Sequence, residues 1–404
     1  MSSAWVIGLV AALAVAAQLG AAVLNGAILA LVAFAVWNHS SIRAPKPLLI
    51  ASTLLFVISL AHALVGHDPI SAWGYATQMR QVLVLLIVGA LSSQLNDKHR
   101  RLVLYIALGG AALSVLYSFY QVLSKTTGPL LALHPDALKW PSRNYRASGE
   151  WLTFSINGLR GTGMVHHVLS FAHVSCMLSL AALSQAIFGA PRKASWWTLA
   201  AVALTGVLLS GARAALVGWL VGVALLVSLR WFRDRRWRRA ILVVSLLGVG
   251  GGFLGVATSE PLRQRIGSFE ARQLIWSQGW KAATETFPRG LGFGAYPAYA
   301  ERIYPDLPGL APKVRAWAHN VWLSLFAEAP LVVPALLVFL GVILLRAERM
   351  LGQPQTAVWG AMVLSSLLAW VAIGLFHDSH FQREYFPFVL WLWGLGLSAR
   401  WSEA

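Results

Sequence analysis

The sequence has few charged residues, and most of those are basic. Asp, Glu, Lys and Arg together make up 12% of its 404 residues, which is about half the share found in a typical soluble domain. Hydrophobic residues make up 57%. The shortage of charge excludes an ordinary soluble domain, and the excess of apolar residues indicates a protein that lies mostly in lipid.

Several other features are missing. Cys176 is the only cysteine, which excludes an intramolecular disulfide and leaves the redox compartment open. No Lys or Arg precedes Arg43, so the basic region of a secretory signal is absent and we expect the first apolar run to be retained as a span. The sequence has no Walker-type phosphate loop and no Gly-x-Ser-x-Gly motif, so ATP hydrolysis and serine hydrolysis have no support.

Apolar runs, by contrast, extend along the whole chain. A helix that crosses the hydrocarbon core of a membrane needs roughly 20 apolar residues, and about twelve such spans fit the sequence. We therefore predict an all-α integral membrane protein that forms a single polytopic domain over residues 1–404. The expected spans lie near residues 5–19, 21–37, 48–65, 76–95, 102–123, 164–189, 195–211, 214–230, 240–258, 319–345, 356–376 and 386–399.

The basic residues are distributed unevenly between the two sides of these spans. The net charge of +17 would suggest a nucleic-acid partner in a soluble protein, but here the charges lie between apolar runs, where membrane orientation and anionic lipid explain them. The short segments on the side of the N-terminus hold sixteen of the 32 Lys and Arg and only four of the fifteen acidic residues. The positive-inside rule therefore predicts that both termini are cytoplasmic.

Two long segments, at about 124–163 and 259–318, then lie outside the cytoplasm. The second contains "FEARQLIWSQGWKAATETFP" at 269–288, in which Leu274, Trp276, Trp280 and Ala283 form an apolar stripe that ends before Pro288. This pattern predicts a helix, and the tryptophans favour a helix that lies on the membrane surface.

Four arginines on the outer side are not needed by the positive-inside rule. Arg160 precedes a span, Arg213 lies between two spans in "LSGARAAL", and Arg265 and Arg272 are seven residues apart, so they share a face if that stretch is helical. A guanidinium group pairs well with phosphate oxygens. These arginines indicate a site for a lipid-linked phosphate or pyrophosphate, with simple headgroup contact as the alternative.

Three glycines follow the predicted outer helix in "RGLGFGAY". Gly290, Gly292 and Gly294 stand at alternate positions, and a loop of this kind can approach a phosphate or sugar closely. The loop does not follow a strand of a βαβ unit, so a dinucleotide site is excluded. A plain turn after Pro288 is the alternative.

A histidine and an asparagine stand at the mouth of the span near 319–345, in "WAHNVWLSLFAE". The imidazole of His319 can accept a proton near neutral pH. Asn320 can bind a hydroxyl group or cap the helix that follows. A polar cap without catalytic function is the alternative for both residues.

The other histidines do not complete a metal site. His377, Asp378 and His380 form "HDSH", and His173 lies seven residues after His166 and could share its helical face. No carboxylate pair or Cys and His set accompanies them in the sequence, so we expect no metal.

The order of these motifs resembles that of the O-antigen ligase family. The motifs are "RGTG" from Arg160, "SGAR" ending at Arg213, "RQLIW" from Arg272, "GLGFG" at 290–294, and "HN" at His319 with Glu328 downstream. The family belongs to a wider group with O-antigen polymerases and bacterial protein O-oligosaccharyltransferases. The resemblance extends over about 160–330, with one departure: Ala212 replaces the second serine of the family's usual "SGSR".

The resemblance implies a multi-span glycosyltransferase of the GT-C type in the bacterial inner membrane. It implies that the long segments are periplasmic, that the donor is an undecaprenyl pyrophosphate-linked polysaccharide, that the acceptor is the lipid A core, and that neither metal nor nucleotide sugar is used. His319 would be the base of an inverting transfer. The substrate-binding candidates are Arg160, Arg213, Arg265, Arg272, Asn320, Gly292 and Gly294.

Two alternatives to a ligase remain at this stage. An O-antigen polymerase or a protein O-oligosaccharyltransferase would use the same donor, so the arginines do not separate them from a ligase. A transporter of an anionic lipid-linked glycan would need charged residues deep within the spans. The clear charges lie at the ends of the expected spans, which favours chemistry on one side of the membrane.

Overall fold

We describe the protein from a computed structural model. The structure describes residues 3–19, 21–37, 44–65, 79, 81–124, 162–164, 168–189, 193–231, 234, 236–237, 240, 243–244, 269–303, 318–377 and 385–401.

The regular elements within these residues are all helical, as expected. They comprise 14 α-helices and one short 3₁₀ helix. The α-helices are α1 (Ser3–Leu19), α2 (Ala21–Trp37), α3 (Lys46–Val65), α5 (Val82–Ser92), α6 (Asp97–Ser124), α9 (Val168–Phe188), α10 (Lys193–Ser210), α11 (Arg213–Trp231), α14 (Phe269–Thr286), α15 (Tyr296–Ile303), α17 (Val321–Glu328), α18 (Val332–Met350), α19 (Ala357–Gly374) and α20 (Tyr385–Leu397). The 3₁₀ helix η5 (Ser398–Arg400) follows α20 directly.

Six of these helices are long and apolar enough to cross a membrane, so the chain is a multi-pass membrane protein. They are α3, over Lys46–Leu64, and α6, α9, α10, α11 and α19. Three shorter apolar helices, α1, α2 and α5, coincide with further expected spans. The span expected near 240–258 lies almost wholly outside the described residues.

The bundle is built around α9 and α19. In each of these helices 89% of the apolar window is buried inside the protein, against 33% to 44% in the other four candidate spans. Small residues allow close helix contacts there: a Cβ atom at Gly222 of α11 would meet Leu180 of α9, and one at Gly218 would meet Ile373 of α19. Because lipid tails are as apolar as leucine, such close packing is what holds helices together in a membrane.

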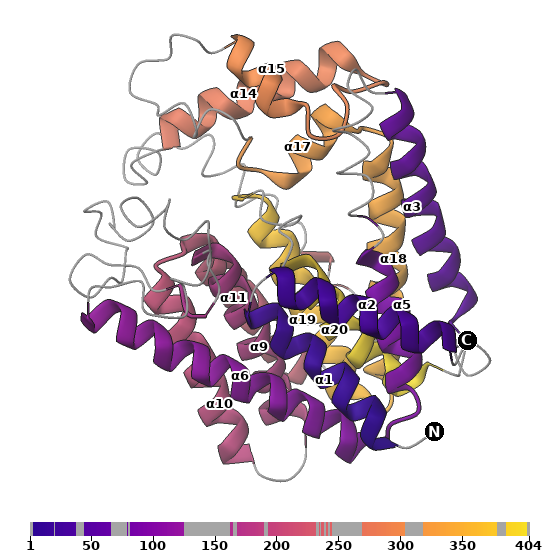
Figure 1. Cartoon of the computed structure of the whole chain (residues 1–404), viewed down its shortest axis with the longest axis vertical. Helices are drawn as coiled ribbons and strands as arrows, with labels where there is room; N and C mark the ends of the chain where they lie inside the picture. Colours follow the sequence, from indigo (N-terminus) through magenta and orange to yellow (C-terminus); the bar gives the residue numbers. More distant parts are fainter. Residues whose placement is uncertain are drawn as a thin grey trace.

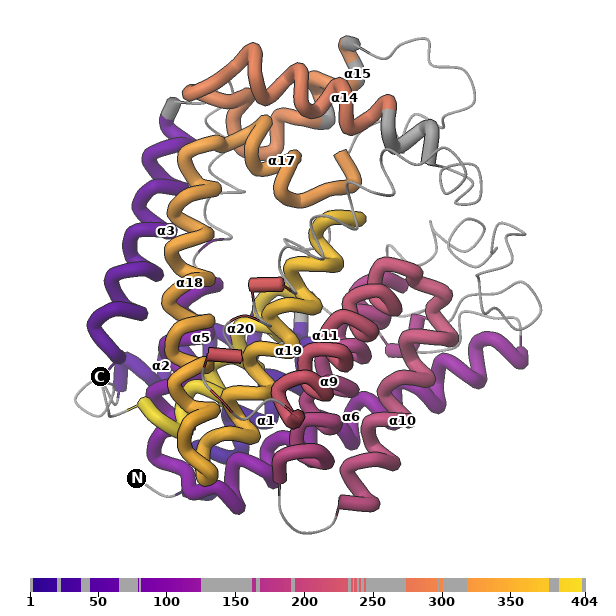
Figure 2. The backbone as a smooth tube through the Cα atoms, turned by 180° about the vertical axis from the view of Figure 1, so that it is seen from behind, coloured from indigo at the N-terminus to yellow at the C-terminus, as the bar shows by residue number. Residues whose placement is uncertain are grey.

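The single span expected at 319–345 is wrong, because the structure divides it into α17 and α18. The break falls at Pro330, which has no N–H to donate to a helix. Ala329 before it has φ −148° and ψ 68°, in keeping with the bias against helical conformation in a residue that precedes proline. The chain changes direction there, so that α17 packs on α14 while α18 runs beside α3 (Figures 1 and 2).

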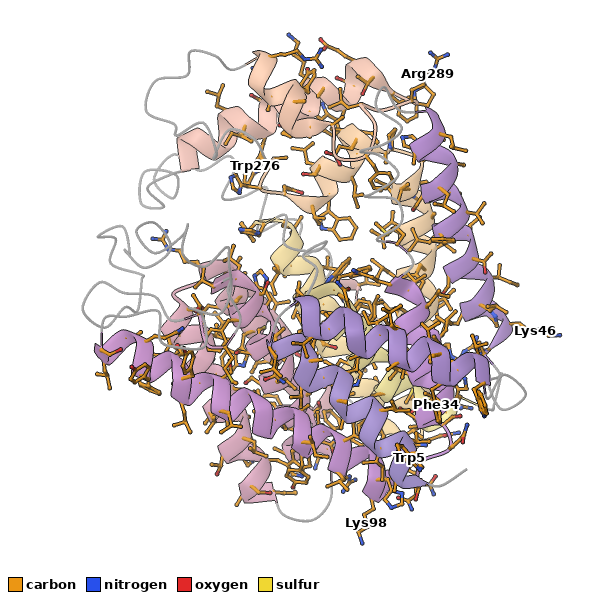
Figure 3. All side chains as sticks on the ribbon, in the orientation of Figure 1. Trp5, Phe34, Lys46, Lys98, Trp276 and Arg289 are labelled. Atoms are coloured by element: carbon orange, nitrogen blue, oxygen red, sulfur yellow. The ribbon has the colours of Figure 1, made fainter. Side chains whose placement is uncertain are left out.

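Three helices, α14, α15 and α17, form a layer at one end of the molecule, which we call the outer layer. Helices α3 and α18 connect it with the bundle (Figures 1 and 2). Figure 3 shows Arg289 at the outer layer and Lys98 at the opposite end of the molecule. The described part of the long segment, 269–303, and the start of α6 therefore lie at opposite ends of the molecule.

The helix expected at 269–288 is confirmed as α14, which ends at Thr286 just before Pro288. The side chains of its apolar stripe are only partly exposed. Ala283 is fully buried and Trp276 is 9% exposed, whereas Trp280 is 59% exposed and stacks on Phe326 of α17 at a ring-centroid distance of 5.8 Å. Much of the stripe therefore packs on protein, which the sequence could not distinguish from a lipid surface.

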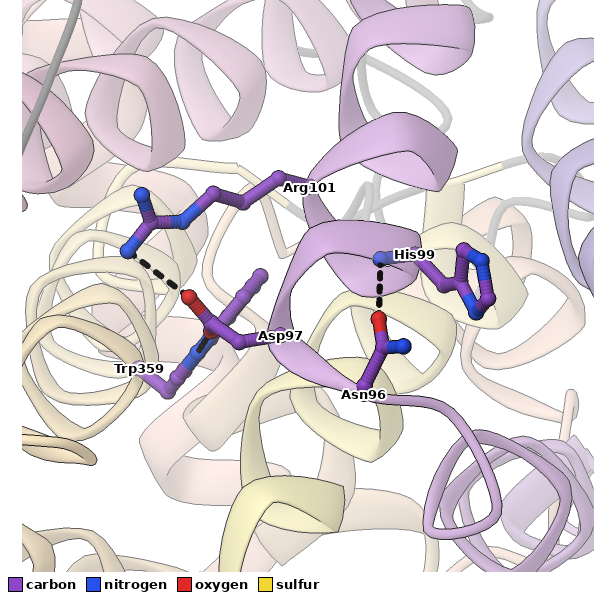
Figure 4. Close-up of polar contacts among 5 residues, drawn as sticks. All are labelled: Asn96, Asp97, His99, Arg101 and Trp359. Atoms are coloured by element: carbon purple, nitrogen blue, oxygen red, sulfur yellow. Dashed lines mark hydrogen bonds and ion pairs between the residues drawn. The ribbon is translucent and has the colours of Figure 1, made fainter.

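At the end opposite the outer layer, polar contacts fasten α6 to α19 (Figure 4). The indole nitrogen of Trp359 donates a hydrogen bond of 2.7 Å to Asp97, and Arg101 forms an ion pair of 2.8 Å with the same carboxylate. The side chain of Asn96 accepts a hydrogen bond of 2.9 Å from the backbone N–H of His99, which satisfies one of the unpaired N–H groups at the start of α6.

Candidate functional site

His319 lies in a tight turn immediately before α17. Its φ of 51° is in the left-handed region, where a residue with a Cβ atom is disfavoured by roughly 1–2 kcal/mol. The next residue, Asn320, is the N-cap of α17, and its side-chain oxygen accepts hydrogen bonds of 3.0 Å from the N–H groups of Trp322 and Leu323. Asn320 therefore has the capping role that the sequence suggested. The cap also fixes the backbone position from which the His319 side chain extends.

The imidazole of His319 lies at one end of a row of rings. The ring of His377, just after α19, lies 5.9 Å away in a T-shaped arrangement. His173 of α9 lies 6.0 Å beyond His377, and Tyr385, the first residue of α20, lies 4.9 Å from His173. We call His319, His377 and His173 the histidine row. It joins the turn before α17 to α19 and α9 of the bundle.

The glycine-rich loop lies along the C-terminal end of α17. The N–H groups of Leu291 and Gly292 donate hydrogen bonds of 2.9 Å to the carbonyl oxygens of Ala327 and Glu328. Gly290, Gly292 and Gly294 all have positive φ, at 69°, 98° and 74°. A Cβ atom on Gly290 would also collide with the backbone of Glu328. The turn therefore requires glycine at position 290. The N–H of Gly292 already donates a hydrogen bond within the protein, so it is not available to a ligand.

Glu328 connects this loop to two further helices. Its carboxylate accepts a hydrogen bond of 3.0 Å from the N–H of Tyr296, at the N-terminus of α15, where a negative charge is stabilised by the helix dipole. The side chain of His62 on α3 contacts the Glu328 carbonyl oxygen at 3.3 Å. Glu328 is 8% exposed. These contacts give Glu328, known from the sequence only as the end of a motif, a structural role.

The "SGAR" motif forms the turn between α10 and α11. Gly211 has a φ of 61°, and the Oγ of Ser210 accepts a hydrogen bond of 3.1 Å from the N–H of Ala212. The departure from the family pattern falls on Ala212, which is 5% exposed. Arg213 is the half-buried first residue of α11. A cation at a helix N-terminus opposes the helix dipole, so helix stability does not explain this arginine.

The "RGTG" motif is attached to α6 by a buried glutamine that sequence reasoning did not single out. Gln121 is 1% exposed. Its Nε2 donates to Thr162 Oγ1 and to the Gly163 carbonyl, both at 3.1 Å, and its Oε1 accepts from the N–H of Thr162 at 3.0 Å. A polar residue near the C-terminal end of an apolar span was the only signal in the sequence.

Several predicted site residues cannot be placed. Arg160, Arg265, His166, Asp378 and His380 lie outside the described residues. Arg272 lies on α14, but its side chain is also outside the description. The convergence of the four arginines therefore stays a prediction. Among the residues that the structure does describe, no group of three or more His, Cys, Asp or Glu could hold a metal ion.

The fold and these motifs define a class of protein: a multi-pass membrane protein, all-helical in its described residues, with an outer layer of three helices. Residues 198–331 match a family model described as Wzy_C, O-Antigen ligase. They carry a domain of that family, and the resemblance is confirmed over this stretch, which includes "SGAR", the glycine-rich loop and His319. The "RGTG" motif precedes the match. A search of curated proteins found no match.

The domain family consists of O-antigen ligase and polymerase-type enzymes. The match therefore indicates a membrane enzyme that transfers glycans and uses lipid-linked glycan substrates.

Proposed function

We propose that the protein is an O-antigen ligase, which transfers a polysaccharide from undecaprenyl pyrophosphate to the lipid A core. The observation that carries the proposal is the family domain over residues 198–331, in which the cap of α17 fixes the turn that carries His319. The proposal includes about twelve spans in a GT-C type arrangement. It places both termini in the cytoplasm and the outer layer in the periplasm.

The proposed reaction needs a base for the acceptor but no acid for the donor. The imidazole of His319 takes the proton from a sugar hydroxyl of the acceptor as its oxygen attacks the anomeric carbon of the donor. The bond from that carbon to the pyrophosphate oxygen breaks, and undecaprenyl pyrophosphate leaves with the electron pair. Direct attack from the opposite face inverts the anomeric centre, and no metal takes part in the proposed steps.

Arginines stabilise the departing pyrophosphate in this scheme. Arg213 is the described candidate, and Arg160, Arg265 and Arg272 are proposed to join it. Guanidinium groups can donate two hydrogen bonds at once to phosphate oxygens, and charge that develops on a leaving group is stabilised by cations already in place.

The remaining candidates have narrower roles than the sequence alone allows. The N–H of Gly292 donates a hydrogen bond to the Glu328 carbonyl oxygen. We therefore propose that Gly292 and Gly294 act by having no side chain, which lets a sugar approach the backbone closely. The side-chain oxygen of Asn320 is occupied by the start of α17. We therefore propose the helix cap as its main role, which leaves only Nδ2 for a substrate contact.

The acceptor distinguishes a ligase from the alternatives. Purified protein in lipid nanodiscs is given an undecaprenyl pyrophosphate-linked glycan together with lipid A core, a second lipid-linked glycan, or an unfolded acceptor protein. We expect transfer to lipid A core, detected by the size of the product. Transfer only to the second glycan would identify a polymerase, and transfer only to protein an oligosaccharyltransferase. Donor movement across the bilayer without transfer would identify a transporter.

A further inference from the structure

The histidine row brings together three residues that are far apart in the sequence. His173 comes from α9, His377 from the end of α19, and His319 from the turn before α17. His319 and His377 are half-buried, whereas His173 is 0% exposed. His377 is the middle member, in ring contact with both of the others.

A structural explanation alone does not account for the row well. His173 lies in the core of the bundle with Tyr385 against its ring. An imidazole is costly to bury in apolar surroundings, and an aliphatic or phenyl side chain would fill such a position at lower cost. From His173 the row continues through His377 to His319, the residue proposed as the base. The buried histidine is therefore connected to the proposed site by ring contacts.

We propose that His377 is a positioning residue for the transfer reaction: its ring fixes the orientation of the His319 imidazole, and His173, which packs against Tyr385, holds His377 in place on its other side. This inference rests on the proposed function, in which His319 is the base. It adds a site residue from outside the region matched by the family domain, because His377 lies after residue 331.

The need for such a residue follows from how His319 is attached. Its backbone belongs to the outer layer, whereas His377 and His173 belong to the bundle. A shift of about 1 Å in a reacting group can lower a rate by about 10²-fold. T-shaped ring pairs have a preferred geometry, so contact with His377 limits rotation of the His319 ring relative to the bundle.

The test compares the kinetics of three variants with the wild-type protein in nanodiscs, using lipid-linked glycan and lipid A core as substrates. For His377→Ala we expect kcat to fall by about 10- to 100-fold, while KM for the donor stays within about twofold because the arginines are untouched. We expect His377→Phe, which keeps a ring, to recover most of kcat. We also expect free imidazole to restore part of the activity of His377→Ala.

His99→Ala is the matched control, since His99 is also a half-buried histidine but lies at the start of α6, near the opposite end of α19. We expect wild-type kcat for this variant and an unchanged Tm for all three. The inference is overturned by any one of the following: wild-type kcat in His377→Ala, a rise in donor KM alone, a loss of kcat that follows a lower Tm, or an equal loss in His99→Ala.

These outcomes are separate from failure of the proposed function. If His319→Ala is inactive while His377→Ala works at the wild-type rate, His319 remains the base and only the positioning role is lost. If the wild-type protein transfers no glycan to lipid A core, or if His319→Ala transfers it normally, the proposed function itself is wrong.

Discussion

The bundle and the outer layer are stabilised in different ways. The bundle buries large side chains completely, among them Trp359, Trp370, Trp391 and Trp393. The core of the outer layer is a small cluster, mainly of alanines, with Leu291 and Tyr296 as its largest buried members. Burying a large apolar side chain contributes about 1.5–3 kcal/mol in water, and an alanine much less, so this cluster alone holds the outer layer weakly.

Polar contacts supply the remaining stabilisation of the outer layer. The cap of Asn320, the contact of Glu328 with α15, and the backbone bonds between the glycine-rich loop and α17 all lie within it. The bundle instead relies on close packing of apolar helices, as expected where lipid replaces water. Substitutions of polar residues within the outer layer should therefore affect that layer and leave the bundle intact.

The largest expected effect is that of His319→Ala. Loss of a general base lowers a rate by about 10²- to 10⁴-fold, so we expect glycan transfer to become undetectable in a standard assay. Expression, membrane insertion and Tm should stay near wild type, because the bundle is untouched. Transfer is measured from product size, and Tm from a thermal shift in detergent. Normal transfer by the variant would remove His319 from the mechanism.

Much of the fold follows from the sequence alone, because apolar length and charge bias are local signals. Residues 102–123 were expected as a span and lie within α6, and the helix before Pro288 ends where the proline predicts. The break at Pro330 was missed because apolar residues continue on both sides of it, so hydropathy does not change there.

The candidate site was less predictable, because it depends on contacts between distant residues. His319 and Asn320 stand out as polar residues at the start of an apolar run. The contacts of His319 with His377, and of Gln121 with Thr162, arise only when separate helices pack together. No local pattern encodes those pairings. The sequence around a histidine in an apolar helix does not show whether another ring packs against it.

The next largest effect is expected for Arg213→Lys. Lysine keeps the positive charge but cannot donate two parallel hydrogen bonds to a phosphate group. We expect kcat/KM to fall by about 10- to 100-fold, in line with roughly 1.5–3 kcal/mol for a hydrogen bond to a charged group. Steady-state kinetics at several donor concentrations measure this. Wild-type kcat/KM would show that a simple positive charge at the start of α11 is enough.

A smaller, local effect is expected for Glu328→Ala. The variant leaves the N–H of Tyr296 without its acceptor, at a cost of roughly 1–3 kcal/mol. Hydrogen–deuterium exchange should rise over Tyr296–Ile303 and stay unchanged over α9. Glu328→Gln keeps an acceptor oxygen, so its exchange rate over Tyr296–Ile303 should lie between those of Glu328→Ala and the wild type. An equal rise in both regions would contradict the separation of the outer layer from the bundle.

The smallest effect is expected at Asn320, where two roles can be separated by two substitutions. Asn320→Ala removes the cap and should destabilise α17 by about 1 kcal/mol, which exchange over Val321–Glu328 would detect. Asn320→Asp keeps an oxygen that can accept from Trp322 and Leu323, but it replaces the amide nitrogen. If Asn320 acts mainly as a cap, the aspartate variant should transfer glycan within about threefold of the wild-type rate, because aspartate caps helices as well as asparagine does. A large loss with α17 still protected would instead show that Nδ2 contacts the substrate, and the start of α17 would then belong to the chemistry of the site as well as to the stability of the outer layer.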